Sequence, residues 1–277
     1  MSTGRIRAET ATVIAVASSD ARHEVYEALD TLVRTAGVRP AVLTLGTDTE
    51  PQRTDRGGTT VIDGLVSRYL NNAVASLRLS SLPAVAWWRE PSPEGLTELA
   101  DLVDRLVLDV EDPTAVWGMV PDLAGRTAVS DLRWTRLTRW RDLFAQFFDL
   151  PEVRLGSKAF THLELSGGDR HALRLLGGWI TSRLPGGGGL DISIEAGSGG
   201  APIHTVRLAH EAGALSLRLL PDQTCIETLV SLAGIPASSR VVPAGDRRLA
   251  ALLGEELRVR SRDIAFEDAV AAAGGIG

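Results

Sequence analysis

The residues best suited to binding chemistry gather in one short run, Asp131-Leu-Arg-Trp-Thr-Arg-Leu-Thr-Arg-Trp-Arg141. Four arginines and two tryptophans lie within residues 133 to 141. A guanidinium group binds carboxylates and phosphates through paired hydrogen bonds, and tryptophan offers a large, rigid apolar surface. The run therefore suits a protein interface, a phosphate or a single nucleic-acid strand. Composition alone favours a structural alternative, in which the tryptophans are core and the arginines lie over a sheet edge.

A second candidate segment is Trp87-Trp88-Arg89, at the end of the apolar run that begins at Pro83. Ligands and partners of open α/β sheets gather at the carboxyl ends of the strands. Adjacent strand residues point to opposite faces, so at most one of these tryptophans packs into a given layer. The other must pack against the opposite layer or lie at the surface.

Motifs for nucleotide binding and for catalysis are missing. The loop after the first apolar run reads Ala17-Ser-Ser-Asp-Ala21 and lacks the Gly-x-Gly-x-x-Gly pattern through which a backbone approaches a pyrophosphate. The glycines at 186–189 lack a lysine and lead into a predicted strand, so we expect a turn there. There is no Gly-x-Ser-x-Gly elbow for a serine nucleophile. We therefore expect neither a cofactor nor catalytic residues.

Metal ligands are equally sparse. The five histidines include no pair at the four-residue spacing of a helical zinc site. His162 and Glu164 share a strand face and could bind a metal with a third ligand, but a solvent-facing pair is the favoured interpretation. The single cysteine, Cys225, lies in an apolar pattern typical of inert core. No metal is expected.

Composition excludes several classes of protein. The chain has 277 residues, a formal net charge of −6 and 44% hydrophobic residues, which is typical of a soluble globular protein. The acidic balance argues against nucleic-acid binding, which needs clustered Lys and Arg. No apolar run reaches the roughly 18 residues of a membrane span, and the N-terminus lacks a signal-peptide pattern. We therefore expect a cytoplasmic protein without a membrane partner.

The first 150 residues predict a Rossmann-like domain. Short apolar runs alternate with segments of helical period, which indicates crossover connections and a doubly wound, mostly parallel sheet without a phosphate-binding loop. We expect Asp20 to cap the first helix and Gly37 to end it, and we expect residues 47–58 to form a solvated loop. The predicted strands are 12–17, 40–45, 59–62, 83–88 and 105–109, and further helices occupy 65–77, begin at Ser92 and begin at Thr138.

Residues 151–277 predict a second domain, of the α+β class. Alternating strands at short spacing indicate antiparallel pairing, and two helices close the chain. The predicted elements are strands at 160–165, 190–195, 203–209, 214–220 and 224–230, and helices at 169–184, 246–258 and 263–273. The domain boundary is placed at residue 150, where Leu150-Pro151 interrupts a helical pattern.

Three segments together resemble the glucose-6-phosphate dehydrogenase assembly protein (OpcA) family. They are Leu82-Pro-Ala-Val-Ala-Trp-Trp88, the run from Asp131 to Arg141 and, more weakly, Gly178-Trp-Ile-x-x-Arg-Leu184. The run Asp-Leu-x-Trp-Thr-Arg-Leu is the most specific of the three. Arg139 departs from the family pattern, because many members have proline there.

The resemblance implies a non-enzymatic protein that binds glucose-6-phosphate dehydrogenase and promotes its active oligomeric form in the oxidative pentose phosphate pathway. The Trp/Arg segments would then form, or support, the docking surface. The candidate partner-binding residues are Trp87, Trp88, Arg89, Asp131, Arg133, Trp134, Thr135, Arg136, Trp140 and Arg141. The alternative is a sugar-phosphate- or nucleotide-binding sensor, or an enzyme of carbohydrate metabolism, that grips a phosphate with the arginine cluster.

Overall fold

The computed structural model describes residues 9–46, 51–197, 200–259 and 261–276. The chain forms two compact units, of which the first comprises Met1–Thr135 and Arg247–Asp263, and the second Arg136–Asp246 and Ile264–Gly277. The first break lies 15 residues before the expected boundary at residue 150, and a segment near the C-terminus returns to the first unit. The chain therefore crosses between the units three times.

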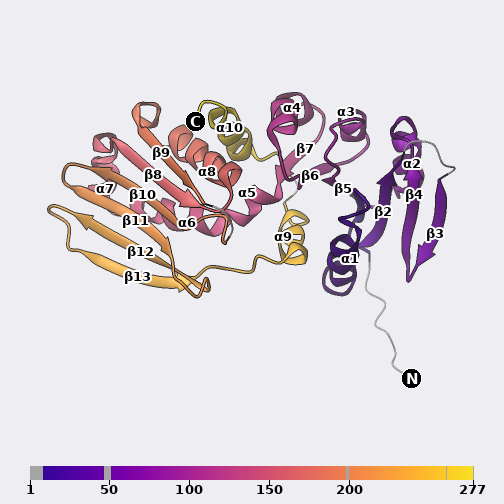
Figure 1. Cartoon of the computed structure of the whole chain (residues 1–277), viewed down its shortest axis with the longest axis horizontal. Helices are drawn as coiled ribbons and strands as arrows, with labels where there is room; N and C mark the ends of the chain where they lie inside the picture. The colour runs from indigo at the N-terminus through magenta and orange to yellow at the C-terminus, as the bar shows by residue number, and fades with distance from the viewer. Residues whose placement is uncertain (1–8, 47–50, 198–199, 260, 277) are drawn as a thin grey trace, which may run out of the picture. The chain divides into compact units, whose positions relative to one another are not determined.

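The first unit is built on a seven-stranded sheet in the order β3-β4-β2-β1-β5-β6-β7 (Figure 1). Every neighbouring pair is parallel except β3 with β4. The predicted Rossmann-like, mostly parallel sheet is thus confirmed. The strands are β1 Thr12–Ala17, β2 Arg39–Leu45, β3 Gln52–Arg56, β4 Thr59–Leu65, β5 Ala84–Arg89, β6 Arg105–Leu108 and β7 Ala128–Asp131.

Helices cover both faces of this sheet (Figure 1). One face packs its alternate residues, such as Val13, Ala15 and Trp87, against α1 and α9 in a buried apolar core. The helices α2, α3 and α4 lie on the other face. The helices are α1 Arg22–Ala36, α2 Leu70–Leu77, α3 Leu96–Ala100, α4 Thr114–Ala124, α5 Leu132–Arg136 and α9 Leu249–Glu256, with a 3-10 turn η1 at Ser67–Tyr69.

Some elements of the first unit agree with the sequence prediction and others differ from it. Gly37 ends α1 at a φ of 66°, as predicted, but Ala21 rather than Asp20 precedes the helix and no side chain caps it. The predicted loop contains β3, an exposed polar edge strand, while residues 47–50 of that loop lie outside the described residues. Neither α4, which contains Pro121, nor the four-residue β7 was predicted.

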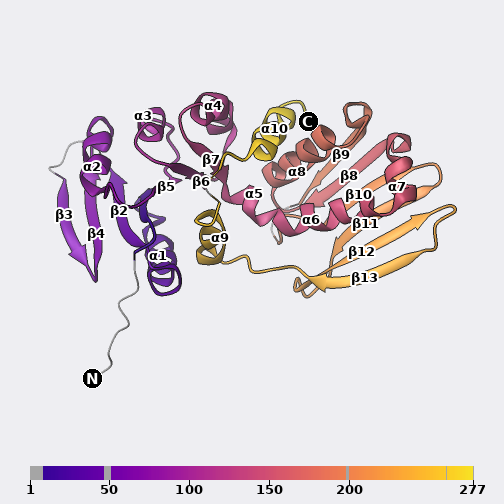
Figure 2. The ribbon, with the colours of Figure 1, turned by 180° about the vertical axis from the view of Figure 1, so that it is seen from behind.

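The second unit is built on a six-stranded sheet in the order β13-β12-β11-β10-β8-β9 (Figure 2). All neighbouring pairs are antiparallel except β8 with β9, which confirms the predicted α+β class with mainly antiparallel strands. One strand, β13, was not predicted. The strands are β8 His162–Gly167, β9 Asp191–Ala196, β10 Thr205–His210, β11 Gly213–Leu219, β12 Cys225–Leu232 and β13 Ser238–Pro243.

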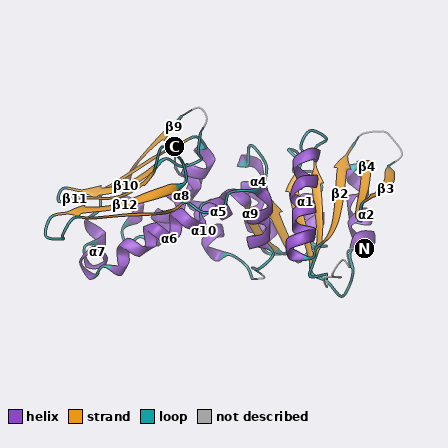
Figure 3. Ribbon diagram, turned by 90° about the horizontal axis from the view of Figure 1, so that it is seen from below, coloured by secondary structure: helices purple, strands orange, loops and turns teal. Residues whose placement is uncertain are grey.

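The helices of the second unit gather on one side of its sheet (Figure 3). Asp169 caps α8 by accepting hydrogen bonds from the backbone N–H groups of His171 and Ala172. The helices are α6 Thr138–Gln146, α7 Pro151–Leu155, α8 Arg170–Arg183 and α10 Ile264–Ala273, with 3-10 turns η2 Phe147–Asp149, η3 Ser157–Ala159 and η4 Gly187–Gly189. In the described part of the chain, no helix is both long and apolar enough to cross a membrane.

Candidate functional site

The first candidate site is the switch point of the first sheet, between β1 and β5. The strand order reverses there, and in open α/β sheets ligands bind beyond the strand ends at that point. Arg89, the last residue of β5, pairs with one carboxylate across this point and with a second on the side of β6. Its Nη1 lies 2.9 Å from Glu24 Oε2 on α1, and its Nε lies 3.2 Å from Asp109 Oδ2 just beyond β6. Ion pairs within the chain therefore join the end of β5 to α1 and to the residue after β6.

Trp87 helps to hold Arg89 in place. The guanidinium carbon of Arg89 lies 5.5 Å from the centroid of the Trp87 ring, within range of a cation–π contact. The indole Nε1 of Trp87 donates to Asp109 Oδ2 over 3.2 Å. Glu24 lies in the first turn of α1, so a carboxylate already stands at the helix end that would attract a phosphate.

A second ion pair lies at the same edge of the sheet, beyond β2. Arg22 Nη2 approaches Asp63 Oδ1 to 2.7 Å, and the hydroxyl of Thr44 donates to the same oxygen over 3.0 Å. Arg22 starts α1, Thr44 lies at the end of β2 and Asp63 lies in β4. These contacts tie the first helix to the ends of two strands.

The tryptophans of both candidate segments belong to the core. Trp87 and Trp88 are fully buried on opposite faces of β5, and Trp134 and Trp140 are also buried. Seven of the ten candidate residues are buried, namely Trp87, Trp88, Asp131, Arg133, Trp134, Thr135 and Trp140, while Arg89, Arg136 and Arg141 keep intermediate exposure. These seven buried residues can hold neighbouring surface residues in place, but their own side chains are not accessible to a partner.

Asp131 and Arg133 form a buried polar pair at the end of β7. Asp131 accepts from Trp117 Nε1 over 2.9 Å and from the backbone N–H of Arg133 over 2.7 Å. Arg133 Nη1 donates to the carbonyl of Val110 over 2.6 Å, and its Nη2 donates to the carbonyl of Glu111. The arginine thus joins β7 to the loop after β6 instead of binding a phosphate.

Burial raises the pKa of Asp131 from 3.8 to about 6, although Arg133 and Trp117 favour the charged carboxylate. The folded state therefore binds a proton more tightly than the unfolded state. The stability from this proton is fully present below pH 3.8 and is lost as the pH rises through about 6.

We expect this titration to disappear in Asp131→Asn. Between pH 4 and 7 the free energy of unfolding of the wild type should fall relative to that of Asp131→Asn by about 2 kcal/mol, which is most of the effect of a pKa raised from 3.8 to about 6, because each pKa unit corresponds to about 1.4 kcal/mol. Urea titrations of both proteins at several pH values measure the difference. Parallel pH dependences would contradict a raised pKa at Asp131.

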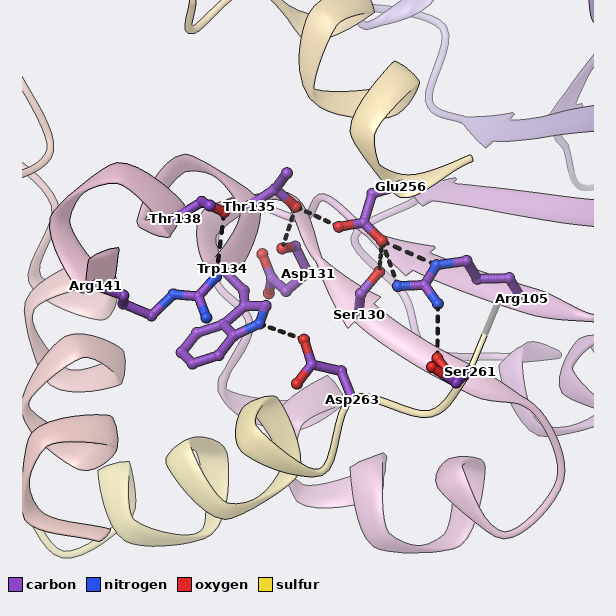
Figure 4. A network of polar contacts seen from close by, with 10 residues as sticks. All are labelled: Arg105, Ser130, Asp131, Trp134, Thr135, Thr138, Arg141, Glu256, Ser261 and Asp263. Carbon is purple, nitrogen blue, oxygen red and sulfur yellow. Dashed lines mark hydrogen bonds and ion pairs between the residues drawn. The ribbon is translucent and has the colours of Figure 1, made fainter. Parts of the chain in front are cut away.

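Sequence reasoning missed a buried polar network that is centred on Glu256 of α9 (Figure 4). Its Oε2 accepts from Arg105 Nε over 2.9 Å, from Arg105 Nη2 over 2.5 Å and from the hydroxyl of Ser130 over 2.6 Å. Its Oε1 accepts from the hydroxyl of Thr135 over 2.6 Å. Nothing in the spacing of these residues could have revealed the network, because 151 residues separate Arg105 from Glu256.

The rest of the run 131–141 is also held by internal contacts. Trp134 Nε1 donates to Asp263 Oδ2 over 2.7 Å, and Arg141 Nη2 donates to the hydroxyl of Thr138 over 3.1 Å (Figure 4). Arg139, which departs from the family pattern, donates from Nε to the carbonyl of Pro243 over 3.0 Å. The run therefore stabilises each unit through contacts within that unit.

His162 and Glu164, which the sequence analysis considered as possible metal ligands, contact other side chains of the protein. Glu164 Oε1 lies 2.5 Å from Arg207 Nη1, and His162 Nδ1 lies 2.7 Å from the hydroxyl of Thr161. Within the described ranges, no group of three or more His, Cys, Asp or Glu residues could hold a metal ion.

The fold and the bridged switch point define a two-unit α/β protein with a Rossmann-like first unit. The family model for the C-terminal domain of the glucose-6-phosphate dehydrogenase subunit matches residues 127–270, from just before β7 into α10. The chain belongs to this family, the OpcA family.

Two cyanobacterial relatives carry the name "Putative OxPP cycle protein OpcA". The protein of Synechococcus elongatus is 32% identical over 185 residues, which is 62% of this chain and 38% of the relative. The protein of Synechocystis sp. is 28% identical over 188 residues, which is 64% of this chain and 36% of the relative. The matched region therefore spans little more than a third of each relative's length.

Two solved structures share the fold. The aldose-aldose oxidoreductase of Caulobacter crescentus, complexed with glycerol, matches with a TM-score of 0.53 and 11% identity over 97% of this chain and 96% of that one. A super-repressor mutant of Gal80p from Saccharomyces cerevisiae matches with a TM-score of 0.53 and 9% identity over 96% and 94% of the two chains. At such low identity, these matches establish the fold alone.

Proposed function

We propose that this chain acts by contact: it binds glucose-6-phosphate dehydrogenase and promotes the dehydrogenase's active oligomeric form, without catalysing a reaction itself. The observation that carries the proposal is the family match over residues 127–270, whose description names a subunit of that enzyme. A partner that prefers one state of an oligomeric enzyme shifts the enzyme toward that state by the difference in affinity.

The bridged switch point supports this proposal. The ion pair between Arg89 and Glu24 lies at the switch point, in the first turn of the helix where a Rossmann-like protein would hold a pyrophosphate, and Asp109 binds Arg89 from the side of β6. Of the ten candidate residues, the partly exposed Arg89, Arg136 and Arg141 would make direct contact with the dehydrogenase. The seven buried residues would support the surface around them.

The direct test adds the purified chain to glucose-6-phosphate dehydrogenase from the same organism. We expect turnover to rise with the concentration of the chain, and the sedimentation profile of the dehydrogenase to shift toward one oligomer. Unchanged turnover and an unchanged profile at saturating chain would refute the proposal.

The alternative, a sensor of sugar phosphates or nucleotides, predicts a different result for the chain alone. We expect calorimetric titration with NADP⁺ or glucose 6-phosphate to show no binding, because Glu24 and Asp109 place negative charge beside Arg89. Saturable heat with either compound in the absence of the dehydrogenase would favour the sensor.

A further inference from the structure

The strand β9 forms one edge of the sheet in the second unit, opposite β13 (Figure 2). In the described part of the chain it pairs with β8 alone, in parallel and without a bulge. The backbone N–H of Asp191 donates to the carbonyl of Thr161, just before β8, over 2.8 Å. Because backbone groups alternate in direction along a strand, those of Ile192, Ile194 and Ala196 point away from β8. These outward groups have no partner among the described residues, so they can pair with one more strand.

The apolar side chains of β9 extend a buried layer to this edge. Ile192 aligns with Leu163 of β8. Ile194 aligns with Leu165, and both leucines are buried. The two isoleucines are only half-buried, because no described strand lies beyond them. An added strand with apolar residues at the matching positions would remove their remaining surface from water, which favours its binding.

The other side chains of β9 determine the charge that suits a partner strand. Asp191, Ser193 and Glu195 are exposed on the opposite face, and β9 has no basic residue. The Asp191 side chain is 82% exposed, and its contact with His162 Nε2, at 3.9 Å, lies toward β8 and not toward the edge. Cross-strand pairs of opposite charge stabilise a sheet, whereas like charges destabilise it. A strand with basic residues opposite the two acids therefore fits this edge.

A second copy of this chain fits the same edge poorly. If β9 paired with itself around a two-fold axis at Ser193, Asp191 of each copy would lie opposite Glu195 of the other. These like charges would repel each other. The acids therefore oppose self-pairing and leave the edge available to a basic strand.

We propose that the outer edge of β9 binds an extended segment of a partner protein in antiparallel pairing, with basic and apolar residues alternating along that segment. This mode of recognition takes its affinity from main-chain hydrogen bonds and its specificity from alternate side chains. The basic residues would face Asp191 and Glu195. The apolar residues would lie beside the two isoleucines, on the face against which α8 packs. Antiparallel pairing is slightly more stable per residue than parallel pairing.

An NMR titration of the isotope-labelled full chain with a blocked heptapeptide of alternating lysine and valine tests this edge. We expect the amide signals of Ile192, Ile194 and Ala196 to shift, since these groups would gain hydrogen bonds. A heptapeptide of alternating glutamate and valine should bind about tenfold more weakly, because its charges repel the two acids. N-methylation of the valines removes the N–H groups that would face β9, and it should also weaken binding about tenfold.

Charge reversal on the chain provides the reciprocal measurement. Asp191→Lys combined with Glu195→Lys should exchange the preference, so that the glutamate peptide binds about tenfold more tightly than the lysine peptide. The matched control is Asp30→Lys combined with Glu98→Lys, at exposed helical positions of the first unit, which should keep the wild-type preference. Thermal unfolding of both variants verifies that they are folded.

Four outcomes would overturn the proposal. The first is a wild type whose Ile192 and Ile194 amide signals do not shift with the lysine peptide. The second is equal binding of the lysine peptide and either the glutamate or the N-methylated peptide. The third is a folded charge-reversed variant that still prefers the lysine peptide. The fourth is a shift of the same signals with chain concentration in the absence of peptide, which would assign the edge to a second copy.

Discussion

Replacing Glu256 with alanine is expected to lower the free energy of unfolding of the first unit by about 3–5 kcal/mol, because it leaves a buried charge without its partner. Glu256 and Arg105 are 5% and 4% exposed, and their ion pair lies among the hydroxyls of Ser130 and Thr135. The substitution removes the carboxylate that accepts hydrogen bonds from Arg105, Ser130 and Thr135, and it leaves a cavity where the side chain was. Arg105 keeps a bond to the carbonyl of Ser261, over 3.3 Å, which does not neutralise its charge.

Thermal unfolding measures this effect, with hydrogen exchange at β6 and β7 to locate it in the first unit. The expected fall in Tm is on the order of 10 °C. Glu255→Ala, at the exposed neighbouring position, is the matched control and should change stability by less than about 1 kcal/mol. Arg105→Met combined with Glu256→Leu should recover much of the loss, since an apolar pair removes the unpaired charge. A loss below about 1 kcal/mol in Glu256→Ala would show that the network contributes little.

The second large effect is expected at Gly178, where α8 crosses α10. A Cβ atom at this position would lie 2.3 Å from the carbonyl oxygen of Ala269 and 2.8 Å from the backbone nitrogen of Ala273. Both atoms belong to the backbone of α10, so the helices must move apart. We expect Gly178→Ala to destabilise the second unit by about 3 kcal/mol, although alanine favours a helix by about 1 kcal/mol.

Chemical denaturation of Gly178→Ala beside Gly118→Ala tests this packing. Gly118 lies within α4, and a Cβ atom there meets nothing within 4 Å. The same substitution should therefore leave stability unchanged or raise it by up to about 1 kcal/mol. Equal effects of the two substitutions would mean that the close approach of α8 and α10 is not a constraint.

The predictable elements of the fold were those with a strong apolar pattern. β1, β2, β5 and β6 are buried on both faces and read as continuous apolar runs. β3 is exposed at every position and has no such signal. For α9, periodicity indicated a helix but could not show that it packs against the first sheet, because that depends on contacts more than a hundred residues apart.

The candidate site was only partly predictable for a related reason. The type of a residue does not show whether it lies at the surface, and the same tryptophan and arginine composition suits an interface and a polar core. Trp88 and Trp134 belong to the core, and Arg133 binds backbone carbonyls. The ion pair between Arg89 and Glu24 could not be predicted without the strand order, and apolar runs alone do not give that order.

The return of α9 to the first sheet has a consequence for synthesis on the ribosome. The guanidinium of Arg105 receives its carboxylate partner only after a further 151 residues have been added to the chain. Domains usually fold as units in the order in which they emerge. Here the first unit cannot finish folding before residues 136–246 of the second unit have been translated, so its core stays incomplete on the ribosome until α9 has emerged.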